Sequence, residues 1–454
     1  MFSNYIILWC RLLSAMSRMS LYHSDLGKAK ENLVFRSICT TFDLRSKVGG
    51  TSEKPKKIWF SARFALPLAP PKVLTLGKDQ INFGFSLAYS YLCPLVKKDY
   101  SSYLEFLRWC LDASAPLPTS VDKIDWTDLY RFARRQTVEA TYWEGIERLD
   151  QSHKLLLTET EVLTWMARAK KIERRNRMVY EKAAWVWNNF RREGFRSCVL
   201  KGQGNALLYP TPYMRTPGDI DIWVEGGDDK VISYVNGIVS GKKVTYHHIE
   251  FLKAGKVSVE VHYRPSWMSH PVHNKRLQAW FLAHADACFS NEKKDWGFCV
   301  PTFEFNVIFL LSHIYTHLIR EGVGLRHVVD YYHLLQGHPH HPRPSEEELR
   351  RLGLRHVAGA LMWVLNNTLG LPDDLLICQP DERRGRVLLG EILKGGNFGK
   401  HDDRAFGGST KNSVRSNMRV ATRDLRLLFQ YPSECVTEPW FRVWHYFWRR
   451  KHQP

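Results

Sequence analysis

The spacing of apolar side chains divides the chain into two helical parts with a β-rich part between them. From about residue 101 to residue 195, and again after residue 302, apolar residues recur every three to four positions, as on one face of a helix. Between these parts the pattern changes to the alternation typical of strands with one buried face. The expected helices cover residues 103–111, 126–149, 159–193, 303–320, 325–335 and 346–369.

The β-rich part predicts a small mixed sheet. Its apolar runs are short and are separated by segments with helical spacing or by glycine-containing turns. The expected strands are 197–200, 219–224, 244–252 and 257–263, with helices from Gln203 and over 228–240 and a hairpin turn at 254–255. This order favours an α+β fold: a small mixed β-sheet with helices on one face, flanked by N- and C-terminal helical regions.

Four regions follow from these patterns: an extension at 1–95, a helical region at 96–195, a core at 196–300 and a second helical region at 301–454. The first hundred residues have little periodicity and carry 15 Lys/Arg against 6 Asp/Glu, a net charge of +9. We therefore expect a poorly ordered basic extension, much of it dispensable. The chain as a whole carries a charge of +19, which predicts an anionic partner.

Composition excludes several other classes of protein. With 44% hydrophobic and 24% charged residues, the chain is expected to be a soluble globular protein. No stretch is apolar over the length of a membrane-spanning helix, so we expect no stable membrane insertion. The nine cysteines include no C-x-x-C pair, which argues against a disulfide framework or a zinc knuckle and favours the cytoplasm.

Three acidic residues are the best candidates for chemistry. Asp219 and Asp221 share one face of an expected strand, with Ile220 on the opposite face, and Glu260 lies on another alternating strand. Each close pair of carboxylates repels by roughly 4 kcal/mol at an effective dielectric constant near 20. A hard divalent cation such as Mg2+ removes this repulsion, so the three are predicted metal ligands and catalytic residues.

A turn just upstream predicts phosphate binding. Lys201, Gly202, Gln203 and Gly204 lie between a strand and an expected helix, where glycine allows close backbone approach and the helix start favours an anion. Arg215, four residues before Asp219, has two interpretations: it clamps phosphate, or it pairs with a surface acid.

The ordered set of turn, acid pair and third acid resembles the nucleotidyltransferase superfamily. More narrowly, the chain resembles the bacterial group known as uncharacterised nucleotidyltransferases, in which Lys-Gly replaces the Gly-Ser of other members. The stretches 324–330 and 395–399 are further features of this narrower group. The resemblance implies a nucleotidyltransferase-like fold, two Mg2+ ions that bridge a bound triphosphate, and a third acid that assists deprotonation of the attacking hydroxyl or completes the second metal site.

The expected function is that of a Mg2+-dependent nucleotidyltransferase. It would transfer a nucleoside monophosphate from an NTP to a hydroxyl-type acceptor and release pyrophosphate. A small molecule or a protein is favoured over RNA as acceptor, because nearly half of the positive charge lies in the extension. The alternative is a catalytically silent nucleotide-binding sensor or a partner-regulating protein.

Four further features have competing interpretations. His262 shares a face with Glu260 and could tune it, bind substrate or be structural, while Arg264 is a possible phosphate contact. Arg326 and Asp330 lie four positions apart and favour a structural pair within one helix, while the family resemblance implies a substrate-side role as the alternative. The aromatic and basic residues 439–451 predict a helix packed on its own domain, with membrane docking as the alternative.

Overall fold

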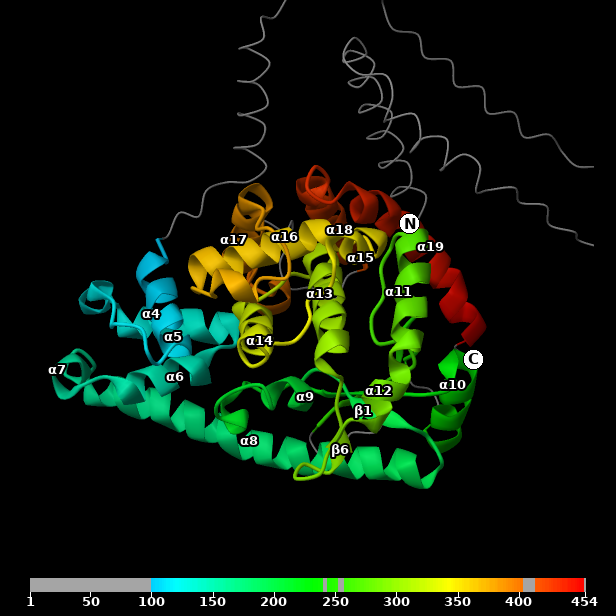
Figure 1. Cartoon of the computed structure of the whole chain (residues 1–454), viewed down its shortest axis with the longest axis horizontal. Coiled ribbons are helices and arrows are strands. Elements are labelled where there is room, and N and C mark those ends of the chain that lie inside the picture. Colours follow the sequence, from blue (N-terminus) through cyan, green and yellow to red (C-terminus); the bar gives the residue numbers. More distant parts are fainter. Residues whose placement is uncertain (1–98, 240–242, 252–256, 403–412, 453–454) are drawn as a thin grey trace, which may run out of the picture. The chain divides into compact units, whose positions relative to one another are not determined.

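The computed structural model describes residues 99–239, 243–251, 257–402 and 413–452, all within one compact unit, Ser90–Pro454. The expected basic extension (1–95, up to residue 98) and the hairpin turn at 254–255 lie outside the described residues. The described part is a mixed α and β fold, in which a four-stranded sheet lies between the long helix α8 and the C-terminal helices (Figure 1).

The N-terminal helices confirm the expected helical region. They are α4 (Ser101–Leu111), α5 (Trp126–Gln136), α6 (Glu139–Arg148), α7 (Gln151–Lys154) and α8 (Glu159–Arg192). The single segment expected over 126–149 is wrong, because Thr137 adopts a left-handed conformation with φ 57° and separates α5 from α6. Helix α8 begins with a capping box between Thr158 and Glu161, which satisfies two otherwise unpaired backbone donors.

The sheet contains the strands that the alternation predicted, each shorter than expected. They are β1 (Ser197–Val199), β2 (Ile220–Val224), β3 (His248–Glu250) and β4 (Val259–His262), in the order β1-β2-β4-β3. Strands β2 and β4 are parallel neighbours, and the two outer pairs are antiparallel. Between the strands lie α9 (Gln203–Ala206) and α10 (Gly227–Ile238), while α11 (Pro271–Ala283), α12 (Ala285–Ser290) and a hairpin of β5 (Glu292–Lys293) and β6 (Phe298–Cys299) follow.

The C-terminal region packs as a group of helices over the other side of the sheet region (Figure 1). They are α13 (Phe303–Arg320), α14 (Leu325–Gln336), α15 (Glu346–Arg351), α16 (Arg355–Trp363), α17 (Glu382–Gly395), α18 (Ser413–Leu427) and α19 (Pro432–His452). The helix expected over 346–369 is interrupted between α15 and α16 and ends in a π-helical turn, Val364–Thr368. In α19, Phe441 stacks on Trp267 at 4.3 Å between ring centroids, so this helix packs on its own domain as predicted.

None of the described helices combines the length and apolarity needed to cross a membrane. All six cysteines in the described residues are free thiols.

Candidate active site

The parallel register of β2 and β4 brings the predicted acids together. Asp221 lies directly opposite Glu260, so their side chains leave the same face of the sheet. His262, two positions further along β4, joins them: its Nε2 is 2.9 Å from Asp221 Oδ1 and 3.6 Å from Glu260 Oε2. One potential ligand atom from each of the three residues lies within 4.8 Å of the others. The histidine is therefore part of the acid cluster.

Asp219 immediately precedes β2 and lines the same pocket as Asp221. The negative charge of Asp221, together with burial, raises the pKa of Asp219 to about 6. Asp221 itself is only 2% exposed. Burial opposes its ionisation, but the Lys201 ammonium and the His262 ring hold the pKa of Asp221 below its ordinary value. The nearby positive charge thus favours ionisation of Asp221, and the ionised Asp221 in turn disfavours ionisation of Asp219.

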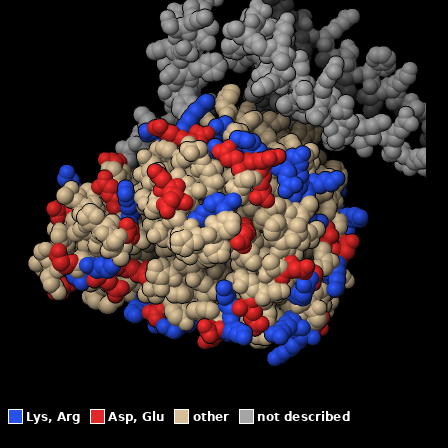
Figure 2. Space-filling model, in the orientation of Figure 1, with Lys and Arg blue, Asp and Glu red and all other residues tan. Residues whose placement is uncertain are grey.

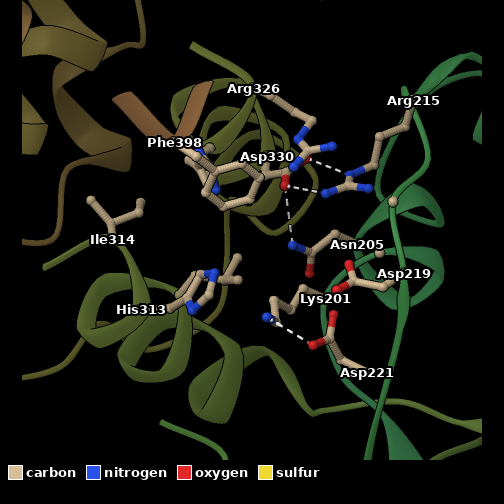
Figure 3. Close-up of a pocket in the computed structure, with 14 residues that line it drawn as sticks. Lys201, Asn205, Arg215, Asp219, Asp221, His313, Ile314, Arg326, Asp330 and Phe398 are labelled. Atoms are coloured by element: carbon tan, nitrogen blue, oxygen red, sulfur yellow. Dashed lines mark hydrogen bonds and ion pairs between the residues drawn. The ribbon is translucent and has the colours of Figure 1, made fainter. Parts of the chain in front are cut away.

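Lys201 supplies part of that charge. Its Nζ lies 2.8 Å from Asp221 Oδ1, a charge-assisted contact (Figure 3). The carboxylates of Asp221, Asp219 and Glu260 and the His262 ring all lie near enough to interact electrostatically with the Lys201 ammonium. Carboxylate oxygens are the donors that Mg2+ prefers. Asp221, Glu260 and His262 place one potential ligand atom each within 4.8 Å of the others, and Asp219 lines the pocket beside Asp221, so the carboxylates of this cluster fit a divalent cation.

Only half of the predicted phosphate turn reaches the pocket. Lys201 and Gly202 line it, and Gly202 has φ 62°, which favours glycine. Gln203 is buried and its amide donates to Asn176 Oδ1 on α8. Gly204 lies against β1, where a Cβ would stand 2.7 Å from the Val199 carbonyl oxygen. The helix expected from Gln203 is the four-residue α9, and neither Gln203 nor Gly204 lines the pocket.

Arg215 is engaged in a buried ion pair, not with a surface acid. Its Nε and one terminal nitrogen each lie 2.8 Å from an oxygen of Asp330 on α14. Tyr209 and Asn205 also donate to the Asp330 carboxylate, at 2.7 and 3.3 Å. The prediction of an Arg326–Asp330 pair is therefore wrong, because Asp330 points toward the loop before β2 and is already saturated there.

Arg326 lines the pocket, a position that its spacing from Asp330 did not indicate. It is 9% exposed, and one terminal nitrogen donates to the Thr216 carbonyl oxygen at 3.2 Å. Its Nε is buried without a hydrogen-bond partner. Burial lowers the pKa of Arg326, with the Arg215 charge acting in the same direction. A buried guanidinium with so few partners has the chemistry to receive an anion.

The pocket encloses about 480 Å3, including its open mouth. Figure 3 shows Asp219, Asp221 and Lys201 on one side and Arg326 and Phe398 toward the other. The helical side of the pocket also contains His313 and His327, and the strand pattern in the sequence indicates neither of them. By contrast, Arg264 points away from this pocket and pairs with Asp228 at 2.7 Å, so its expected phosphate contact is not formed.

The comparison with known families agrees with this geometry. The family described as uncharacterised nucleotidyltransferase matches residues 122–370, more than half of the chain. The chain belongs to this family. The matched part of this nucleotidyltransferase contains both acid-bearing strands and helices α13 and α14, but ends before Phe398. Neither the curated proteins nor the solved structures contain a match to the chain.

Proposed function

We propose that this nucleotidyltransferase moves a nucleoside monophosphate from an NTP to a hydroxyl-type acceptor and releases pyrophosphate, in a Mg2+-dependent reaction. The observation that carries the proposal is the position of Asp219 and Asp221 on one side of a pocket whose other side holds the buried cation Arg326, with Glu260 directly opposite Asp221 in the sheet. A triphosphate carries several negative charges, which a buried cation would hold. It reacts at only one phosphorus, which a metal-binding acid cluster would position.

Asp219, Asp221 and Glu260 would hold the metal ions. When bound, Mg2+ neutralises triphosphate charge and favours ionisation of the attacking hydroxyl. The reaction forms a bond between the acceptor oxygen and the α-phosphorus and breaks the bond from that phosphorus to the oxygen that leaves with pyrophosphate. Glu260 is our candidate to accept the hydroxyl proton, because its side chain is 25% exposed whereas that of Asp221 is 2% exposed.

Two cationic side chains are our candidates to hold the phosphates. Arg326 has a buried Nε without a partner, and phosphate oxygens are the acceptors that suit a guanidinium. Lys201 pairs with Asp221 across 2.8 Å, so neutralisation of that carboxylate would free the ammonium to contact a phosphate as a point charge. Arg215 would act indirectly, by fixing the pocket wall through Asp330.

The acceptor is proposed to be a small molecule or a protein. Figure 2 shows one face of the described part, on which Lys and Arg alternate with Asp and Glu and form no continuous basic surface. A site for RNA would favour a basic stripe with aromatic stacking positions.

The test is turnover of α-labelled NTPs with Mg2+ by the purified full chain in the presence of cell extract. We expect pyrophosphate release and label in the small-molecule or protein fraction, both lost in Asp219→Asn/Asp221→Asn. Asp229→Asn is the matched control, because its side chain is 95% exposed. Clear nucleotide binding without turnover for any NTP would instead support the silent sensor, and label in RNA would overturn the proposed acceptor class.

A further inference from the structure

Three histidines form a second cluster outside the acid site. His313 and His317 lie one turn apart on α13, and His327 lies in the first turn of α14. One ring nitrogen from each lies within 4.8 Å of the others. The chain separates these residues by a helix end and a glycine-containing turn, so their convergence is a property of the folded structure. Neither the acid site nor the proposed phosphate contacts use them.

The surroundings of the cluster resemble those of metal-binding histidines. The Nδ1 of His317 lies 3.1 Å from Glu321 Oε2, and a ligating histidine commonly donates its second nitrogen to a carboxylate in this way. His327 is only 7% exposed, and its Nδ1 is buried without a hydrogen-bond partner. Leaving such a nitrogen unsatisfied is unfavourable, and a bound ligand would offset this cost.

An aromatic side chain covers the cluster on one side. Phe398 lies 5.1 Å from the His317 ring and 5.7 Å from the His327 ring, between centroids. Its loop approaches the segment between α13 and α14 so closely that a Cβ on Gly322 would stand 2.7 Å from the Gly399 nitrogen. The two glycine-containing stretches singled out in the sequence, 324–330 and 395–399, thus meet at this cluster and give it an apolar cover.

We propose that His313, His317 and His327 bind a divalent transition metal ion of the Zn2+ type, with an open coordination position toward the pocket. Three imidazole nitrogens at about 2.1 Å from an ion stand roughly 3.4 Å apart in tetrahedral geometry, so small side-chain rotations within the observed 4.8 Å complete the site. Nitrogen donors favour Zn2+, Co2+ or Ni2+, whereas the carboxylates of the acid site favour Mg2+. The opening toward the pocket follows from His313 and His327, which both line it.

The charges around the cluster are compatible with a cation. Glu321 supplies a negative charge at His317. The cations that act on the cluster or on Glu321 include Lys201, Arg215, Arg320 and Arg326. Three of them are paired with carboxylates: Lys201 with Asp221, Arg215 with Asp330 and Arg320 with Glu438. The inference does not depend on the proposed nucleotidyl transfer, since metal binding is measured directly.

The experiment titrates the chelator-stripped full chain with Co2+ alone and follows the visible absorption of the ion together with its binding stoichiometry. We expect one equivalent bound to nitrogen ligands, lost in His317→Gln and weakened about tenfold or more in Glu321→Gln, the typical cost of removing a carboxylate behind a ligating histidine. His341→Gln is the matched control, since that ring is half-exposed on a loop. Circular dichroism and thermal melting check that each variant folds.

Two further variants separate this site from its neighbours. Asp219→Asn/Asp221→Asn should keep the Co2+ absorption while losing turnover, so failure of the metal site and failure of the proposed function are distinguishable. His248→Gln tests the other described group of histidines, His247, His248 and His262. Absence of stoichiometric binding, equal binding by His317→Gln, or loss in His248→Gln in place of His317→Gln would each overturn the inference.

Discussion

The two sides of the pocket are built in different ways. The sheet side takes Asp219 from just before β2 and Asp221 from β2, with Glu260 opposite Asp221 on the neighbouring parallel strand β4. The helical side takes Arg326 and Phe398 from elements far apart in sequence, α14 and the loop after α17. The sheet side thus depends on local periodicity, and the helical side on tertiary packing.

From this difference we expect the two sides of the pocket to have different roles in the reaction, which variants on each side can test. Acids on the sheet side would act mainly on the rate of the chemical step, because they hold the reacting centre. Cations on the helical side would act mainly on nucleotide affinity, because they contact groups that do not react. Variants on the two sides should therefore separate in kcat and KM.

The largest effect is expected for Glu260→Gln. Loss of this carboxylate should lower kcat on the order of 10³-fold, or about 4 kcal/mol of transition-state stabilisation, with little change in thermal stability. Glu292→Gln is the matched control, because Glu292 is an exposed strand residue in the separate sheet of β5 and β6. Steady-state kinetics with Mg2+ check this, and equal activity of Glu260→Gln and the control would remove Glu260 from the mechanism.

Asp330→Asn should instead damage the fold of the helical side. It leaves the buried Arg215 guanidinium without its carboxylate, which typically costs about 3 kcal/mol in the free energy of unfolding. Burial opposes ionisation of Asp330, but the Arg215 charge holds its pKa below the ordinary value. A lowered pKa stabilises the fold fully above the unfolded pKa of about 3.9 and loses that contribution as pH falls through the folded pKa.

The difference in unfolding free energy between the wild type and Asp330→Asn should therefore stay constant from about pH 5 to 8 and shrink below about pH 4. Chemical denaturation at several pH values measures it, with the exposed Asp374→Asn as control. A difference that grows as the pH falls would contradict the sign of this pKa shift.

The same contrast explains how much the sequence could predict. Alternation fixes which face a strand side chain leaves, so the meeting of Asp221 and Glu260 required only that their strands be neighbours. The partner of Asp330 could not be predicted in this way. Spacing within α14 offered Arg326, whereas the folded chain brings in Arg215 from a loop more than a hundred residues earlier.

Local backbone conformation and packing explain two further differences between the expected and the observed structure. Nothing in the pattern over 126–149 indicated that Thr137 would take a positive φ and divide the helix. Similarly, Gln203 and Gly204 suit a phosphate turn by residue type, but Gln203 contacts α8 and Gly204 packs on β1. In both places packing, and not propensity, decides the outcome.

Arg326→Gln tests the helical side with a smaller effect. Removal of the charge should raise KM for the NTP by about 10–100-fold, with kcat less affected, because a phosphate contact is made in both the ground state and the transition state. Arg350→Gln, at a side chain 65% exposed, is the control. A fall in kcat with unchanged KM would place Arg326 at the reacting phosphate and contradict the proposed difference in roles.

The smallest effect is expected for Gly202→Ala, at the junction of the turn and the acid strand. Gly202 has φ 62°, and a Cβ there would stand 3.1 Å from the Asp219 carbonyl oxygen. Gly227 offers a matched control, since it has φ 75° and nothing within 4 Å of its Cβ position. Alanine at a positive φ costs about 1–2 kcal/mol in stability at either site. Only Gly202→Ala should also displace Asp219 and lower kcat, and equal kcat in the two variants would mean that this backbone contact does not position the acid.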